Sequence, residues 1–562
     1  MIRFLSAIAF STFAVISLNP AFATQTQSAG RGEMKLTLAN IKSALNKHYA
    51  LLDWKIQKRG WTVQERINEI EARIERGDYR NPIEFRKEIV ALIRSAQDYH
   101  LEVAIESTAR ATLPFAVRTV LDTNRTWRSL VVWIEPGSPL ASEISVGDEI
   151  VSFNRRTVAN ELLSLLPIPK YQNKMTAIRW AENFLIDRAG FRGDHVPSGI
   201  ITLGIKKHGS NELKELKVRW NYTREEVPIP EIKPGSLYQA QVSAAPFTNP
   251  WIQGAKIGYL PALGKPILTS DPRSPFHAYA FTHGGKTYGY IRIGSFKSKA
   301  PEASVFEFKR WMSLFQLKTD AIVIDVTSNP GGDVSFMYAL TSVLTDKPLE
   351  PLLFKKKISF DDVRRASLVL KLAANVVDDK TARMYFGNTL LGYPITQAMV
   401  ASLVKEAQLV IKTWENGKTL TPPTFIEGIE VIAPHPASEE DIKLGRPPVY
   451  SKPILLITDE LSLSSAEFFA AVLKDNKRAT VLGIGGSTSG AGGTIREVRF
   501  PNAFGIRHLT ITDSIAYRRN GKMIEEVGVE PDINYTMTAA DIRNGRAGLR
   551  EKILRVLSDL AK

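Results

Sequence analysis

The stretch 461–467, LSLSSAE, places three serines between the apolar run 453–459 and an apolar-faced helix. Ser464 and Glu467 fit a capping box, in which a serine hydroxyl and a glutamate carboxylate satisfy the first backbone N–H groups of a helix. A serine on a tight strand-to-helix turn can instead be the nucleophile of an acyl transfer, because helix-start N–H groups stabilise developing negative charge. Both interpretations are open at this point.

A second turn that could serve acyl transfer lies at 328–333, SNPGGD, directly after the apolar run 320–327. Gly331 and Gly332 let the backbone turn tightly and point N–H groups outward, where they can bind an oxyanion. A plain strand–turn–helix junction explains the same residues. If the apolar runs before the two turns are strands of one sheet, the turns can face a single site.

Composition excludes several other chemistries. The 562 residues contain no cysteine, so thiol catalysis and cysteine-ligated metal sites are excluded. His277 and His283 do not match the helical metal-ligand spacing H-E-x-x-H, and the loop 483–494 lacks the G-K-[ST] of a phosphate cradle. We therefore expect no metal and no cofactor. The formal charge of +15 is interleaved with acids along the chain, which predicts a solvated cationic surface and no nucleic-acid partner.

The N-terminal part of the chain predicts a leader and a helical domain. Residues 1–23 have a basic start, an apolar stretch and a small-x-small cleavage site, which predicts a signal peptide cut near Ala23. The protein is then exported, periplasmic or secreted, without stable membrane insertion. Residues 24–100 predict helices, one of them with Asn81 as its N-cap and a 3.6-period apolar stripe. That helix ends near His100, and a histidine there is ordinarily a helix cap.

Residues 101–222 change to short β-like runs. The segment 135–154, EPGSPLASEISVGDEIVSFN, resembles the PGSPA…LxxGDxIxxING segment of PDZ domains, so we expect a PDZ-like β-domain. Such a domain binds an extended peptide by adding it to an open sheet edge. The glycine-rich carboxylate-binding loop of PDZ domains is not visible here, and a small β-domain used only for packing is the alternative.

Residues 223–284 are rich in Pro, Gly and Ser and predict a linker. The remainder, 285–562, predicts a core region with a mostly helical insertion at about 349–445. Continuous apolar runs in this region predict buried strands that helices cover on both faces, at 288–296, 320–327 and 453–459.

Four motifs in this order resemble the carboxy-terminal-processing (tail-specific) serine peptidases: YGYIRIGSF, DAIVIDVTSNPGGD, SLSSAEFFAAVLKDNKRATVLG and GVEPDI. The resemblance implies an α/β multidomain protein, with a crotonase/ClpP-like αββ catalytic core beside the N-terminal helical domain and the PDZ-like β-domain. It implies that Ser464 is the nucleophile. It also implies that the backbone N–H groups of Ser465, Gly331 and Gly332 form the oxyanion hole.

One difference from most members of that family concerns the general base. They activate the serine with a lysine 25 residues downstream, and that position is Ser489 here, in a loop without lysine. A serine without a base is a poor nucleophile. The segment KMIEEVGVEPDI and the residues after 473 closely resemble the chlamydial protease-like activity factor branch, in which a histidine and a glutamate replace the lysine. The resemblance gives these roles to His100 and Glu525, with Glu526 as the neighbour to exclude.

The expected function is that of an exported serine endopeptidase, which hydrolyses protein or peptide substrates bound as extended strands through a Ser–His–Glu triad. The resemblance also implies a self-cleaving zymogen, with 223–284 as the candidate inhibitory segment, and a possible homodimer. A catalytically inactive peptide-binding scaffold of the same family is the first alternative. A non-peptidic acyl hydrolase on the same core is the second.

Overall fold

The computed structural model describes residues 28–562 except 123, 167–172, 211, 228–248 and 391–392. The predicted signal peptide, and the part of the predicted inhibitory segment between 228 and 248, lie outside the described residues. No helix in the described ranges combines the length and the apolarity that crossing a membrane requires.

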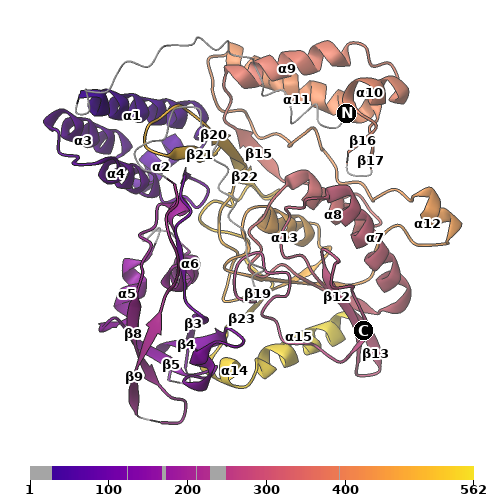
Figure 1. Ribbon diagram of the computed structural model, residues 1–562. Helices are drawn as coiled ribbons and strands as arrows, with labels where there is room; N and C mark the ends of the chain where they lie inside the picture. Colours follow the sequence, from indigo (N-terminus) through magenta and orange to yellow (C-terminus); the bar gives the residue numbers. More distant parts are fainter. Residues whose placement is uncertain (1–27, 123, 167–172, 211, 228–248, 391–392) are drawn as a thin grey trace.

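A seven-stranded sheet forms the centre of the larger lobe (Figure 1). Its strands from β13 onward run parallel, and the two antiparallel strands β11 and β12 extend it at one edge. In spatial order the strands are β11 (Pro266–Thr269), β12 (His277–His283), β13 (Lys286–Arg292), β14 (Ala321–Asp325), β18 (Ile454–Asp459), β19 (Thr480–Ile484) and β23 (Ile533–Tyr535). All residues of β14 and β18 are buried, as their continuous apolar sequence predicts.

Helices cover both faces of this sheet. One face packs against α7 (Pro301–Lys318), α8 (Val334–Val343) and α13 (Ser465–Asp475) in a single apolar core. The other face packs against α15 (Ala547–Leu560), and α14 (Ala539–Arg543) lies beside it. Because β14 and β18 are neighbours and parallel, the turns at their carboxyl ends lie side by side.

Two strands of the sheet come from the stretch 223–284 that the sequence predicts as a linker. β12 pairs with β13 along its whole length, and β11 pairs with β12. Prediction of a linker is therefore wrong for 266–283. The surrounding Pro, Gly and Ser residues outweigh the short apolar run AYAF in the local sequence, and only pairing with β13 makes that run a strand.

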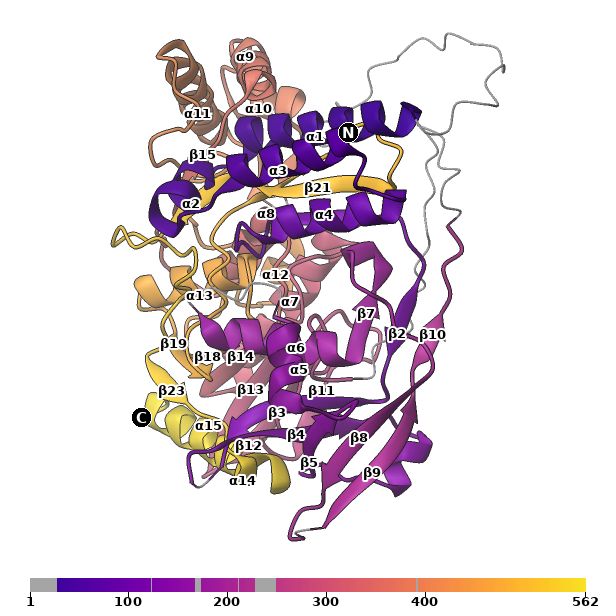
Figure 2. The same cartoon turned by 90° about the vertical axis from the view of Figure 1, so that its left-hand side faces the viewer.

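The N-terminal helices share an apolar core with the strand that follows them and with strands from the other end of the chain. Asn81 caps the fourth helix as predicted, because its side chain accepts the Glu84 N–H at 3.0 Å. The helices are α1 (Ser28–His48), α2 (Leu52–Arg59), α3 (Val63–Arg76) and α4 (Pro82–Arg94), and the strands are β1 (Glu102–Ile105), β21 (Ile506–Thr512) and β20 (Ile495–Val498). Figure 2 shows β21 among these helices. This packing brings the segment around residue 100 to the C-terminal third of the chain.

The PDZ-like part forms a second antiparallel sheet in the lower lobe (Figure 2). Its edge strand β3 packs against helix α6 (Lys174–Ile186). In spatial order the strands are β3 (Phe115–Leu121), β4 (Trp127–Ile134), β5 (Glu149–Phe153), β8 (Ile200–Lys206) and β9 (Leu213–Arg219); β6 (Arg156–Thr157) pairs with β5, and α5 (Val158–Ser164) follows it. A smaller sheet beside them contains β10 (Asn221–Thr223), β2 (Arg110–Thr112) and β7 (Asp187–Ala189).

The stretch after α8 is mostly helical and has a small apolar core of its own. It contains β15 (Leu353–Lys356), α9 (Phe360–Ala373), α10 (Asp379–Phe386), β16 (Thr389–Leu390), β17 (Tyr393–Pro394), α11 (Gln397–Glu415) and α12 (Glu439–Lys443). β15 pairs with β22 (Ser514–Tyr517) and so ties this stretch to the rest of the core. Figure 1 shows α9, α10 and α11 at the opposite end of the molecule from the PDZ-like sheet.

Candidate active site

Ser464 lies on the turn between β18 and α13 in a strained backbone conformation. Its φ is +57° and its ψ is −122°, a region that non-glycine residues rarely occupy. Such a conformation costs about 1–3 kcal/mol and persists only where the surrounding structure enforces it. The side chain is half-buried at the start of the buried helix α13. A serine on a strained strand-to-helix turn is the geometry of an activated nucleophile.

The glycine turn after β14 contacts Ser464 directly. A β-carbon on Gly331 would lie 2.6 Å from the Cβ of Ser464 and 2.9 Å from the backbone nitrogen of Ser465. The two turns therefore meet, as the sequence predicts if their strands belong to one sheet. Any side chain at position 331 would displace the serine, which explains the glycine there.

The N–H groups of this turn are not equivalent. The Gly331 N–H donates to the side-chain oxygen of Asn329 at 2.8 Å, so it is already used within the turn. Among the described residues, the N–H groups of Gly332 and Ser465 have no such acceptor. The Ser465 hydroxyl donates to the Gly332 carbonyl at 2.8 Å and ties the two turns together. The geometry thus favours Gly332 over Gly331 as an oxyanion donor.

The Asp459 carboxylate holds both turns at their strand ends. It accepts the Ser328 N–H at 2.7 Å and the Ser328 hydroxyl at 2.9 Å from one turn. From the other turn it accepts the Leu461 N–H at 3.0 Å. Tyr259 donates its hydroxyl to the same carboxylate at 3.0 Å. Hydrogen bonds to an ionised group are the stronger kind, so Asp459 is a major determinant of how the turns meet.

Glu467 accepts four hydrogen bonds from the residues around Ser464. Its carboxylate accepts the Ser464 N–H at 3.0 Å, which is the glutamate half of the predicted capping box. It also accepts the Thr488 hydroxyl at 2.8 Å and the N–H groups of Gly490 and Ala491 at 2.5 and 2.9 Å. Burial raises the pKa of Glu467 to about 7, although these donors favour the ionised form.

Ser489 lies 25 residues after Ser464, at the position where the sequence resemblance places a lysine. Its hydroxyl donates to the Glu460 carbonyl at 2.7 Å, and its N–H donates to the Ser462 carbonyl at 3.0 Å. It therefore fastens the loop to the turn that precedes Ser464. A serine in these contacts supplies no base.

His100 lies after α4, where the N-terminal helices meet the rest of the core. Its backbone N–H donates to the Asp98 carboxylate at 2.7 Å, and the residue is 7% exposed. Tyr99, the preceding residue, packs in one apolar cluster with Leu463 and Ala491. This cluster brings the histidine segment beside the turn of Ser464. Burial lowers the pKa of His100, and the nearby carboxylates of Asp98 and Asp513 only partly oppose that shift.

Glu525 is fully buried and contacts both the glycine loop and a lysine. One carboxylate oxygen accepts the Gly492 N–H at 3.1 Å, and the other lies 3.0 Å from the Lys55 ammonium. Lys55 also contacts Glu526 at 2.7 Å and the Gln97 carbonyl at 2.7 Å. Burial raises the pKa of Glu525 to about 8, and the attraction of Lys55 opposes this rise. Burial likewise opposes the charge of Lys55, but the surrounding carboxylates outweigh it and raise the lysine pKa.

The structure thus assembles the segments that carry Ser464, His100 and Glu525 into one region. Within the described residues, however, no hydrogen bond directly joins these three side chains. His100 Nδ1 is buried and has no partner in these ranges. Contacts between neighbouring residues bring these segments together, and the three candidate side chains, all in the described ranges, do not hydrogen-bond to one another.

Sequence reasoning missed Lys55. It lies on α2 with Lys58 and Arg59, in a short helix that reads as an exposed basic surface. Yet its side chain is completely buried against Glu525 and Glu526. Nothing in the local pattern distinguishes it from Lys58, because its partners are about 470 residues away in the chain. It therefore links α2 to the strand-turn that carries the candidate glutamates.

Replacing Lys55 by methionine is expected to lower the free energy of unfolding by about 3–5 kcal/mol. The substitution keeps the side-chain length but leaves two buried carboxylates without their common cation. Urea denaturation followed by tryptophan fluorescence measures the change. Lys58→Met, at an exposed position of the same helix, is the control and should change stability by no more than about 0.5 kcal/mol. A loss below 1 kcal/mol in Lys55→Met would show that the carboxylates do not depend on it.

Comparisons with known proteins agree with this architecture. The sequence pattern of peptidase family S41 matches residues 287–535, and that of a PDZ domain matches residues 109–227. The fold and the site therefore define a PDZ-containing peptidase, and the chain belongs to peptidase family S41.

Relatives of the whole chain occur in Chlamydia. An uncharacterized protein of Chlamydia muridarum is 32% identical, with 93% of this chain and 92% of the relative covered. A protein of Chlamydia trachomatis is 29% identical over the same shares. Among solved structures, mature CPAF is 29% identical with a TM-score of 0.82, covering 95% of this chain and 98% of that one. Mature CPAF complexed with lactacystin has a TM-score of 0.81 at 29% identity, covering 95% and 99% of the two chains. The similarity confirms the predicted fold class and the branch that the sequence motifs indicated.

Proposed function

We propose that this protein is an exported serine endopeptidase that hydrolyses peptide bonds of protein substrates with Ser464, His100 and Glu525. The observation that carries the proposal is the contact between Gly331 and Ser464. It sets a serine with φ of +57° against a glycine turn, at the carboxyl ends of adjacent parallel strands. Ligand sites of parallel sheets lie at these ends.

The chemistry follows that of other serine hydrolases. His100 takes the proton of the Ser464 hydroxyl during attack on the scissile carbonyl and returns it to the leaving amine. Glu525 holds the imidazole in the productive tautomer and stabilises the imidazolium. The N–H groups of Gly332 and Ser465 bind the oxyanion, and each such donor lowers the barrier by about 3–4 kcal/mol. Because catalytic hydrogen bonds are often long before substrate binds, the triad is expected to close on the substrate.

The similarity to CPAF supports the finer points of the proposal. Both CPAF structures are of the mature protein, which agrees with synthesis of this chain as a zymogen. We propose self-cleavage as its processing step on the sequence resemblance alone. The S41 peptidase match and the lactacystin complex of CPAF support protein or peptide substrates, which we propose bind to the core as extended strands. The sequence of residues 1–23 supports export to the periplasm or the medium. The resemblance of the sequence motifs to this branch also supports a homodimer.

A fluorophosphonate probe tests the proposal. The probe should react covalently with the purified, processed protein at a single residue, and peptide mapping by mass spectrometry should locate it on Ser464. The same preparation should degrade casein. Absence of both labelling and casein hydrolysis would contradict the proposal, and a label on Ser465 would contradict the choice of nucleophile.

The alternative of an inactive peptide-binding scaffold rests on two observations. No hydrogen bond joins the three candidate side chains in the described residues, and the lysine of most relatives is replaced by Ser489. A scaffold would bind unfolded protein without turnover and without labelling. The probe experiment therefore separates the two functions.

The rate of casein hydrolysis is expected to rise between pH 6 and about pH 8.5. Glu467 and Glu525 act as carboxylates, and burial raises their pKa values to about 7 and about 8, so each gains its active form as the pH rises. Both groups bind a proton more tightly in the folded than in the unfolded chain, so their protonation at low pH does not unfold the protein.

A pH profile of kcat/KM measures this dependence. Glu467→Gln should lower the plateau and remove the ionisation near pH 7, leaving the one near pH 8. If His100 alone controlled the rate, the rise would lie at a lower pH, because burial lowers the pKa of His100 from its ordinary value. A rate that does not change between pH 6.5 and 8.5 would therefore exclude control by the two glutamates.

A further inference from the structure

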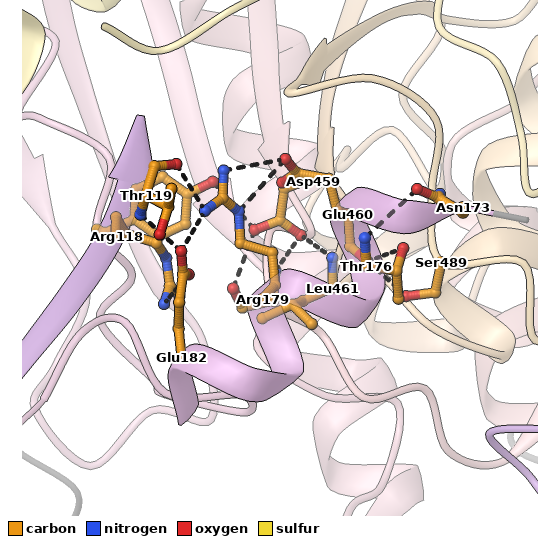
Figure 3. Close-up of polar contacts among 12 residues, drawn as sticks. Arg118, Thr119, Asn173, Thr176, Arg179, Glu182, Asp459, Glu460, Leu461 and Ser489 are labelled. Carbon is orange, nitrogen blue, oxygen red and sulfur yellow. Dashed lines mark hydrogen bonds and ion pairs between the residues drawn. The ribbon is translucent and has the colours of Figure 1, made fainter. Parts of the chain in front are cut away.

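The edge strand of the PDZ-like sheet is closed by side chains of its own domain. An added peptide would pair with the free main-chain groups of such an edge. At the centre of β3, however, the Thr119 N–H donates to the Glu182 carboxylate at 2.6 Å. The Thr119 carbonyl accepts from the Arg179 guanidinium at 3.1 Å. At the end of β3, Leu121 forms a bridge with Thr538 of the core. Figure 3 shows Arg179 and Glu182 projecting from α6 onto this strand.

The same face of α6 contacts the supports of Ser464. Thr176 and Arg179 are three residues apart and so share one face of the helix, and Asn173 is its N-cap. The Asn173 amide donates to the Thr488 carbonyl at 2.8 Å, and the Thr176 hydroxyl donates to the Glu460 carbonyl at 3.0 Å. The Arg179 guanidinium lies 3.4 Å from the Glu460 carboxylate.

Two of the residues that α6 contacts, Thr488 and Glu460, are in turn connected to Ser464. Thr488 donates its hydroxyl to Glu467, which accepts the Ser464 N–H. Glu460 lies four residues before Ser464, on the turn that Asp459 begins. The PDZ-like domain therefore contacts both the loop and the turn that hold the candidate nucleophile in its strained conformation.

The charges at this contact depend on each other. Glu182 is fully buried and Arg179 nearly so, and Glu182 also accepts from the Arg118 guanidinium at 3.2 Å. Burial opposes the charge of Arg179, but Glu182 and Glu460 outweigh it and raise the pKa of the guanidinium. Removing the guanidinium leaves Glu460 buried without a cation. It also leaves the Thr119 carbonyl, at the edge of the sheet, without its hydrogen-bond donor. Such a loss affects β3 and the nucleophile turn together.

We propose that Arg179 is a positioning residue that makes the PDZ-like domain a fixed support of the Ser464 turn, with its peptide-binding edge closed by α6. The domain then does not act as a receptor for peptide at β3. The catalytic consequence rests on the proposed function; the closed edge and the contact with the turn do not.

Hydrogen–deuterium exchange of the full processed chain tests the proposal without reference to activity. In Arg179→Met, amides of 115–121 and of 459–464 should both exchange at least tenfold faster than in the wild type. Arg128→Met is the matched control, because Arg128 pairs with Asp122 and Glu149 inside the same domain. It should leave both segments unchanged. Faster exchange in 115–121 alone would overturn the proposal.

A milder variant guards against misfolding of Arg179→Met. Thr176→Val removes one hydrogen bond to the Glu460 carbonyl and keeps the side-chain volume. It should accelerate exchange in 459–464 and leave 115–121 unchanged. No change in either segment would overturn the role of α6 at the turn. Addition of saturating reduced casein to the Ser464→Ala variant should leave the exchange of 115–121 unchanged, and any change there would overturn the closed edge.

The catalytic arm measures the rate of fluorophosphonate labelling at Ser464. Arg179→Met should be labelled about 10- to 100-fold more slowly than Arg128→Met, with kcat for casein reduced more than KM. Equal labelling rates would overturn the positioning role. If the wild type is not labelled, the proposed function fails, and the exchange experiments still decide whether α6 supports the turn.

Discussion

Ser464→Ala is expected to reduce the turnover of casein roughly 10⁶-fold and to abolish fluorophosphonate labelling. Loss of the nucleophile of a serine protease removes nearly all of the acceleration that the catalytic residues provide together, and only binding and the oxyanion hole remain. The variant should keep the backbone conformation of the turn, because Asp459, Glu467 and Gly331 hold the turn independently of the serine hydroxyl. Steady-state kinetics with casein at several enzyme concentrations measures the loss.

Ser465→Ala is the control for the register of the nucleophile. It removes the hydroxyl that donates to the Gly332 carbonyl but keeps the backbone N–H of position 465. We expect a loss of about fivefold, corresponding to one hydrogen bond of about 1 kcal/mol. If Ser465→Ala loses labelling while Ser464→Ala retains it, the nucleophile is Ser465.

His100→Ala is expected to reduce turnover nearly as much as Ser464→Ala. Among the described residues, Ser489 donates to the Glu460 carbonyl and Lys55 is paired with Glu525 and Glu526, so neither supplies a base to the serine hydroxyl. Without a base the hydroxyl stays protonated and attacks slowly. Measurements of kcat/KM for casein and of the labelling rate should both show the loss. The double variant with Ser464→Ala should be no slower than either single variant, because the residues of a triad act as a unit.

His508→Ala is the matched control for this prediction. His508 lies on β21, in register with Ala104 of β1, and burial lowers its pKa as it lowers that of His100. Its replacement should change turnover less than threefold. If His508→Ala loses as much activity as His100→Ala, the effect reports packing of β1 on β21 rather than removal of a base. If His100→Ala keeps wild-type turnover, His100 is not the base.

Local sequence determined a large part of this protein. The continuous apolar runs of β14 and β18 predict strands buried on both faces, and both are such strands. Asn81 followed by proline specifies a helix start, and that start is observed. The residue types of 461–467 and 328–333 predicted two turns that can face one site if their strands belong to one sheet, and in the structure Gly331 contacts Ser464. These features were predictable because periodicity, caps and glycine turns act over a few residues.

Tertiary structure alone decided the rest. β12 is a strand because it pairs with the edge of β13, and β11 is a strand because it pairs with β12. The residues that flank them predict a linker. Lys55 is buried because Glu525 and Glu526 fold onto α2, and Arg179 closes β3 because α6 packs there. His100 reaches the region of Ser464 only through the shared core of α4 and β21. The carboxylate that pairs with a lysine, or the strand that pairs with another strand, can lie hundreds of residues away in the chain. The local sequence around one partner therefore does not predict the other.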